Sequence, residues 1–79
     1  TLKEQIEIGE NRVRSALNAQ MLSRERYAKG VTSYLEFLES QRQAFDAEIE
    51  LAGYRRELLA TYAQLYKALG GGWQNDQQP

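Results

Sequence analysis

Glu36 and Glu39 are the residues of this sequence whose type and spacing first suggest chemistry. Two carboxylates three positions apart lie on one face of a helix, where they attract cations. The chain has no histidine and no cysteine, so it lacks the commonest general base and metal ligand, and also a thiolate nucleophile. A catalytic site also needs its groups gathered in a pocket. We therefore expect no enzyme activity, no metal site and no cofactor.

The run Gly70, Gly71, Gly72 and Trp73 is a second candidate site, because glycine-rich loops bind phosphate. It lacks the Lys-Ser/Thr pair and the following helix that such a loop requires. We interpret the run as the end of a helix followed by a flexible segment. We expect Trp73 to pack against neighbouring structure. The polar residues 74–79 predict a disordered tail.

Length and charge narrow the classes of function further. The 79 residues contain ten Lys and Arg against eleven Asp and Glu, whereas nucleic-acid-binding modules concentrate positive charge. A chain this short buries only about 60% of its unfolded surface. No apolar run approaches the ~20 residues that span a bilayer as a helix. The balanced charge predicts no nucleic-acid partner. Because the chain starts at Thr1 without a leader, we expect it to be a piece of a larger protein.

Two helical arms, about 2–29 and about 34–69, are predicted on either side of Gly30. Thr1-Leu2-Lys3-Glu4 has the form of a capping box, which a cut inside a longer helix would equally leave. Gly30 is placed to be the left-handed residue that ends the first arm. The second arm opens with a capping box from Ser33 to Glu36 and ends at Gly70. The link is so short that the arms must run antiparallel, so we predict an all-α, two-helix coiled-coil hairpin.

Two further glycines, Gly9 and Gly53, fall inside the helical patterns, where each costs about 1 kcal/mol relative to alanine. Either they mark a close approach of the helices or they are tolerated.

The second arm carries two adjacent series of residues at alternating spacings of three and four, the signature of coiled-coil packing. The Leu35 series comprises Leu35, Leu38, Arg42, Phe45, Ile49, Ala52, Arg56, Leu59, Ala63 and Tyr66. The Tyr34 series comprises Tyr34, Phe37, Gln41, Ala44, Glu48, Leu51, Arg55, Leu58, Tyr62, Leu65 and Leu69. The first arm offers fewer apolar positions, namely Leu2, Ile6, Val13, Ala16, Leu17, Met21 and Leu22.

Two series side by side make a face that is wider than one partner helix covers. The second arm therefore needs neighbours beyond its own hairpin mate. Periodicity alone supports equally a dimeric four-helix bundle and a larger wall of many helices.

The stretch from Tyr27 to Arg42, YAKGVTSYLEFLESQR, resembles the outer-membrane efflux protein family of the TolC and OprM type. The ending LYKALGGGW, from Leu65 to Trp73, resembles the same family. The match covers residues 20–73 well and the first arm more loosely. It identifies the chain as the C-terminal periplasmic hairpin of such a channel, with residues 1–73 as the hairpin.

This resemblance implies a trimer whose β-barrel in the outer membrane continues into a helical tunnel across the periplasm. It implies that one series packs on the hairpin mate and the other on an adjacent helix. It also implies a periplasmic adaptor protein and an inner-membrane pump as partners, in multidrug export or type I secretion.

The resemblance implies two sites at the turn. Gly30, Val31, Thr32 and Ser33 match the tip turn that docks the adaptor, although spacing alone describes a helix-reversing turn with a cap. Glu36 and Glu39 match acidic residues that line the narrowed aperture in some members, although Glu36 is also the reciprocal partner of the Ser33 cap. Thr32 departs from members that carry an arginine latch there.

Arg24, Arg26 and Lys29 supply charge around the tip contact or simply compensate the helix dipole. An alternative function is a stand-alone hairpin that dimerises or scaffolds partners. In isolation we expect the chain to self-associate, because its wide apolar face is otherwise exposed.

Overall fold

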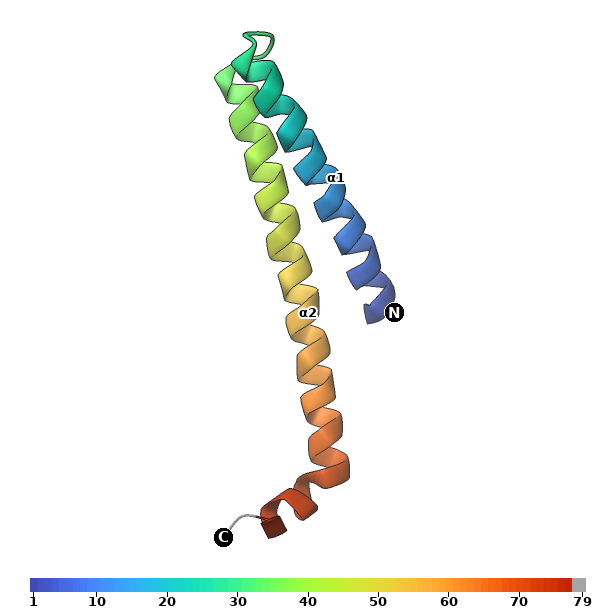
Figure 1. The fold of residues 1–79 in the computed structure, drawn as a ribbon. Helices are drawn as coiled ribbons and strands as arrows, with labels where there is room; N and C mark the ends of the chain where they lie inside the picture. Colours follow the sequence, from blue (N-terminus) through green and yellow to red (C-terminus); the bar gives the residue numbers. More distant parts are fainter. Residues whose placement is uncertain (78–79) are drawn as a thin grey trace.

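The computed structural model describes the backbone of residues 1–77 and the side chains of residues 1–70. It contains two helices, α1 (Leu2–Ala28) and α2 (Tyr34–Gln77), and no strand among the described residues. The helices run antiparallel and side by side, and α2 continues well past the start of α1 (Figure 1). The hairpin measures 65 × 28 × 14 Å. The predicted all-α, two-helix hairpin is confirmed.

Local hydrogen bonds explain where α1 begins and ends. The Glu4 N–H donates to Thr1 Oγ1 at 3.2 Å, and the Thr1 nitrogen donates to Glu4 Oε1 at 3.1 Å, which completes the predicted capping box. At the other end, the N–H of Val31 donates to the Arg26 carbonyl at 2.8 Å. Gly30 has φ +76°, which confirms the left-handed helix end.

The predicted end of the second helix at residue 69 is wrong, because α2 continues through Gly70 to Gln77. Glycine lowers helix stability by about 1 kcal/mol but does not forbid the helix, and the single proline is Pro79. Residues 74–77 of the predicted tail therefore belong to α2, whereas residues 78–79 lie outside the described residues. The Trp73 side chain also lies outside them.

The α2 side of the helix interface follows the Tyr34 series in part: Phe37, Ala44, Leu51 and Leu58 are covered, whereas Glu48 and Arg55 are exposed. Ala44 and Leu51 of this series are 3% and 6% exposed, and neighbouring Ala47 is 6% exposed. On α1 the covered residues, apart from Glu10, recur at spacings of four and three: Leu2, Ile6, Gly9, Val13, Ala16, Gln20 and Ser23. Leu17, Met21 and Leu22, which the sequence offered as apolar positions of the first arm, are exposed.

Gly9 marks the closest approach of the two helices. A Cβ added there would lie 3.2 Å from Leu51 Cδ1, whereas one added at Gly53 would meet only Arg56 Nη2 at 3.9 Å. Of the two explanations for these glycines, close approach therefore applies to Gly9 and tolerance to Gly53.

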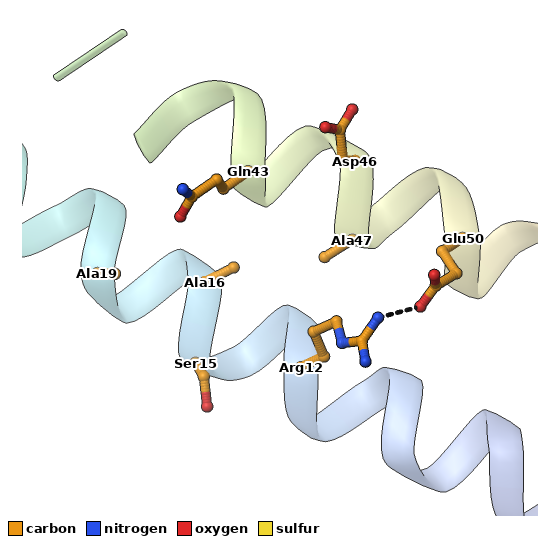
Figure 2. A pocket seen from close by; sticks show the side chains of 8 residues that line it. All are labelled: Arg12, Ser15, Ala16, Ala19, Gln43, Asp46, Ala47 and Glu50. Carbon is orange, nitrogen blue, oxygen red and sulfur yellow. Dashed lines mark hydrogen bonds and ion pairs between the residues drawn. The ribbon is translucent and has the colours of Figure 1, made fainter. Parts of the chain in front are cut away.

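Small side chains and ion pairs complete the interface. Figure 2 shows Ala16 and Ala47 pointing toward one another between the helices, beside a pair between Arg12 Nη1 and Glu50 Oε1 at 2.6 Å. A second pair joins Arg55 Nη2 to Glu10 Oε2 at 3.1 Å. Both pairs are half exposed, so they fix the register of the helices more than they stabilise them.

Candidate functional site

The turn between the helices brings the four predicted tip residues together at one end of the molecule (Figure 1). The Ser33 Oγ accepts the Glu36 N–H at 3.2 Å, as a helix cap does. The Glu36 carboxylate accepts a hydrogen bond from Thr32 Oγ1, a contact within the turn and the first helical turn. The Ser33 cap is thus present, but the reciprocal half of the predicted capping box is not among the described contacts, because the Glu36 side chain accepts from the Thr32 hydroxyl instead.

An aromatic cluster lies directly beside this turn. The rings of Tyr27 and Phe37 stack with centroids 5.7 Å apart and planes 2° apart, and Tyr34 lies 5.4 Å from Tyr27. These rings join the last turn of α1 to the first turns of α2. Such contacts favour one fixed geometry of the two helices at the turn.

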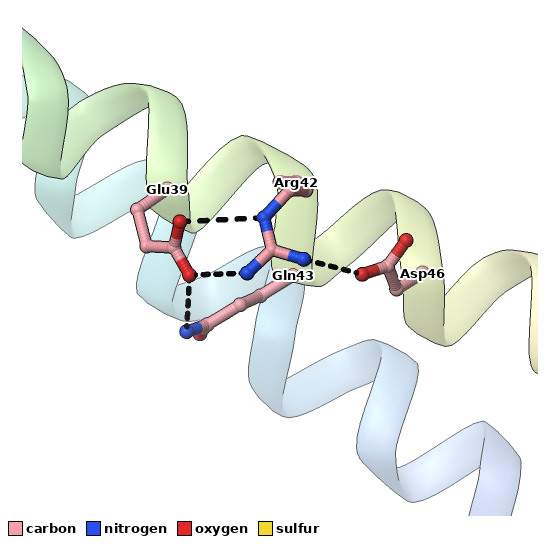
Figure 3. A network of polar contacts seen from close by, with 4 residues as sticks. All are labelled: Glu39, Arg42, Gln43 and Asp46. Carbon is pink, nitrogen blue, oxygen red and sulfur yellow. Dashed lines mark hydrogen bonds and ion pairs between the residues drawn. The ribbon is translucent and has the colours of Figure 1, made fainter.

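The Glu39 carboxylate is held by Arg42 on the same helix (Figure 3). Arg42 Nη2 donates to Glu39 Oε1 at 2.6 Å and Arg42 Nε donates to Oε2 at 3.3 Å. Arg42 Nη1 also donates to Asp46 Oδ2 at 3.1 Å, and Gln43 Nε2 lies 3.5 Å from Glu39 Oε1. The guanidinium therefore sits between two carboxylates, one turn before it and one turn after it.

This contact changes the acidity of both groups. The hydrogen bonds from Arg42, and then its positive charge, lower the pKa of Glu39 below the ordinary value of 4.5. The hydrogen bond to Glu39 and the charges of Glu39 and Asp46 raise the pKa of Arg42. Both groups are charged at neutral pH.

The two predicted aperture residues thus lie on one exposed face but have different partners. The Glu36 carboxylate is hydrogen-bonded to Thr32 in the turn, and the Glu39 carboxylate is hydrogen-bonded to Arg42 one turn further along α2. In the described part of the chain no three His, Cys, Asp or Glu side chains are arranged to hold a metal ion. The basic residues Arg24, Arg26 and Lys29 are exposed, and none of them forms an ion pair among the described residues.

The Leu35 series forms an apolar face on α2 that α1 does not cover. The exposed fractions of Leu35, Phe45, Ile49 and Leu59 are 75%, 63%, 55% and 66%. Beyond the start of α1 every residue from 59 to 69 is exposed, and Tyr62, Leu65, Tyr66 and Leu69 line an apolar groove of about 460 Å³ with Gly70. Exposed apolar side chains in such number, here interrupted by Arg42 and Arg56, are typical of a helix that packs against further partners.

The sequence reasoning missed Arg42 as the partner of Glu39 and counted it only as a member of the Leu35 series. An acidic residue followed by arginine at i+3, with a second acid at i+7, is a signal that would have found it. It also missed the aromatic cluster. Tyr27 and Tyr34 on opposite sides of Gly30 provided that signal.

Neither helix, over the residues described, has an apolar stretch long enough to cross a membrane.

Comparison with known proteins shows that the chain is similar to outer membrane proteins of efflux and export systems. A probable efflux pump outer membrane protein of Pseudomonas putida, TtgC, is 40% identical over 73 residues, or 92% of this chain and 15% of that protein. The solvent efflux pump outer membrane protein SrpC of Pseudomonas putida is 44% identical over 52 residues, or 66% of this chain and 11% of that protein. The pyoverdine export outer membrane protein OpmQ of Pseudomonas aeruginosa is 38% identical over 77 residues, or 98% of this chain and 16% of that protein.

The chain therefore spans less than a fifth of the length of these relatives. No solved structure matches it. The family model described as outer membrane efflux protein matches residues 1–71, which include both arms of the hairpin up to the glycine run. The chain belongs to the outer membrane efflux protein family.

Proposed function

We propose that this chain forms part of the periplasmic helical wall of an outer-membrane efflux channel. The exposed Leu35 series is the observation that carries the proposal, because α2 offers a second coiled-coil face that its own hairpin mate leaves open. A wall helix needs such a face on each side. Family membership favours this channel component over a stand-alone hairpin module.

The channel would be a homotrimer that works with a periplasmic adaptor and an inner-membrane pump. The short share of each relative that this chain covers supports the view that the barrel lies in other parts of the full-length protein. The wall itself acts as a passive duct, and the pump supplies the energy.

The turn from Gly30 to Ser33 is the proposed contact with the adaptor. Val31 is 63% exposed there. The aromatic cluster and the Ser33 cap fix the helix ends that flank the turn. A protruding turn on a fixed base loses little conformational freedom on binding.

Glu36 and Glu39 are the proposed lining of the aperture near this turn. Both carboxylates are exposed. Repeated around a symmetry axis they would form acidic rings, which attract cations and repel anions.

This part of the wall does not select the cargo. The names of relatives with similar identity refer to toluene, solvents, antibiotics and pyoverdine, which have little chemistry in common. Such variety fits a duct whose cargo is chosen elsewhere in the pump.

The tip proposal predicts that Gly30→Pro in the full-length protein reduces export while the protein still inserts into the outer membrane. Proline cannot adopt φ +76° and removes the N–H that Gly30 donates to the Tyr27 carbonyl at 3.0 Å. Export is measured as accumulation of a fluorescent pump substrate, and insertion as protein recovered in outer-membrane fractions.

Gly53→Ala is the matched control, because it changes a glycine that meets only a side-chain end. Contact with the adaptor is tested by cysteine cross-linking from Val31, with Asn11 on the exposed far part of α1 as the control position. Normal export in Gly30→Pro, together with equal cross-linking from both positions, would contradict the tip assignment.

A further inference from the structure

We propose that Arg42 is the positioning residue of the acidic aperture: it holds the Glu39 carboxylate along α2 and thereby sets how strongly the aperture prefers cations. This inference rests on the proposed aperture and deepens it. It assigns a role to a residue outside the Glu36 and Glu39 pair, through the contacts drawn in Figure 3.

The geometry of the contact supports a fixed carboxylate. Two donors of one planar guanidinium reach the two oxygens of Glu39, at 2.6 Å and 3.3 Å. A two-point contact of this kind fixes direction as well as distance. The third donor of Arg42 goes to Asp46, so the guanidinium itself is anchored from the opposite side.

Arg42 also lies in an apolar series, which gives these contacts a second purpose. Its neighbours in the Leu35 series are Leu38 and Phe45, and the proposed wall covers this face with another helix. A guanidinium is costly to remove from water unless its donors are already paired. Glu39 and Asp46 provide those partners within the same helix, so no acid is required from the covering helix.

The charges around Glu39 come from α2 alone. Its carboxylate accepts hydrogen bonds from Arg42 and Gln43, and no ionisable side chain of α1 in the described residues lies within ion-pair distance of it. Removing Arg42 therefore frees the Glu39 carboxylate, exposes its whole charge to the aperture and lets it protonate at a higher pH.

The test uses the full-length trimeric channel in a planar bilayer, with Arg42→Gln as the variant. We expect the cation-to-anion permeability ratio, from reversal potentials in a KCl gradient, to rise about two- to fivefold. Arg56→Gln is the matched control, because Arg56 lies in the same series, loses the same charge and has no ion pair among the described residues. We expect it to leave the ratio unchanged.

A second readout separates positioning from a mere change of charge. Millimolar Mg²⁺ should block the channel, and the block should disappear at a higher pH in Arg42→Gln than in the parent channel. In a Glu39→Gln background, Arg42→Gln should change the pH midpoint of the block and the permeability ratio less than it does in the parent channel. The reason is that effects that act through one contact are not additive.

Equal ratios and equal pH midpoints for the parent and Arg42→Gln would overturn the inference, as would a shift of the same size in the Glu39→Gln background. If Glu36→Gln and Glu39→Gln both conduct with parental selectivity and parental Mg²⁺ block, the aperture assignment fails and the inference fails with it. If Glu39→Gln alters the block but Arg42→Gln does not, only the inference fails.

Discussion

At the residue scale, Gly30 carries the reversal of the chain. Its φ of +76° lies where L side chains are strained, although nothing lies within 4 Å of an added Cβ. The requirement for glycine is thus one of backbone conformation and not of space. The N–H of Val31, bonded to the Arg26 carbonyl, depends on this conformation.

Gly30→Ala should therefore lower the free energy of unfolding of the chain by about 1–2 kcal/mol. Gly30→Asn should lower it less, because asparagine enters the left-handed region more easily than alanine. Urea unfolding followed by circular dichroism, at one fixed chain concentration, measures both. Equal losses for the two variants would contradict a conformational cause.

At the element scale, α2 has two coiled-coil faces with different roles in this hairpin. Leu51 packs against α1 near Gly9 and is 6% exposed, whereas Leu59 on the Leu35 series is 66% exposed. The two leucines sit in one helix, eight residues apart, so their helix propensities cancel in a comparison.

Leu51→Ala should lower the free energy of unfolding by about 2 kcal/mol or more, because it removes buried methyl groups and leaves a gap beside Gly9. Leu59→Ala should change it by less than about 0.5 kcal/mol. Both variants are measured by urea unfolding at a chain concentration low enough for the chain to be monomeric, because association would cover the Leu35 series. Similar losses at the two positions would mean that α1 packs on the Leu35 series instead.

At the scale of the whole molecule, a two-helix hairpin leaves much apolar surface in contact with water. Phe45 and Ile49 lie on the Leu35 series, away from α1, and are 63% and 55% exposed. Large exposed apolar patches of this kind drive association. The expected partner in the full-length protein is another wall helix, and in isolation it is a second copy of the chain.

The isolated chain should therefore sediment as an oligomer whose mass rises with concentration. Replacing Phe45 and Ile49 together by lysine should shift it toward the monomer while the helix content stays high. Val31→Lys, which changes an equally exposed residue at the turn, serves as the control and should leave the mass unchanged. A stable, well-folded monomer of the unmodified chain in analytical ultracentrifugation would contradict this prediction.

The helices and their reversal could be predicted because their signals are local. The Thr1–Glu4 capping box, the Ser33 cap, the 3,4 spacing and Gly30 each act within a few residues, and each is recognisable in the sequence. The end of α2 was predicted wrongly for the same reason. A glycine run destabilises a helix by an amount that the neighbouring helical turns can compensate. The sequence alone does not show whether the cost or the compensation is larger.

The shared face of Glu36 and Glu39 was predictable, but their contacts were not. Glu36 and Glu39 share a face, as expected, yet their partners Thr32 and Arg42 depend on side-chain rotamers that spacing does not specify. Arg42 could have joined either Glu39 or Asp46, and in the structure it joins both.

The sequence by itself determined that this chain makes two antiparallel helices, with a second helix too apolar on two adjacent faces for one partner. Only the tertiary structure decided which face α1 takes. It takes the side of α2 that carries Ala44 and Leu51 of the Tyr34 series, where Leu51 meets Gly9 and neighbouring Ala47 faces Ala16, since small residues let helix backbones approach closely. The bulky Phe45 and Ile49 are thereby left on the open face, where the rest of the channel is expected to cover them.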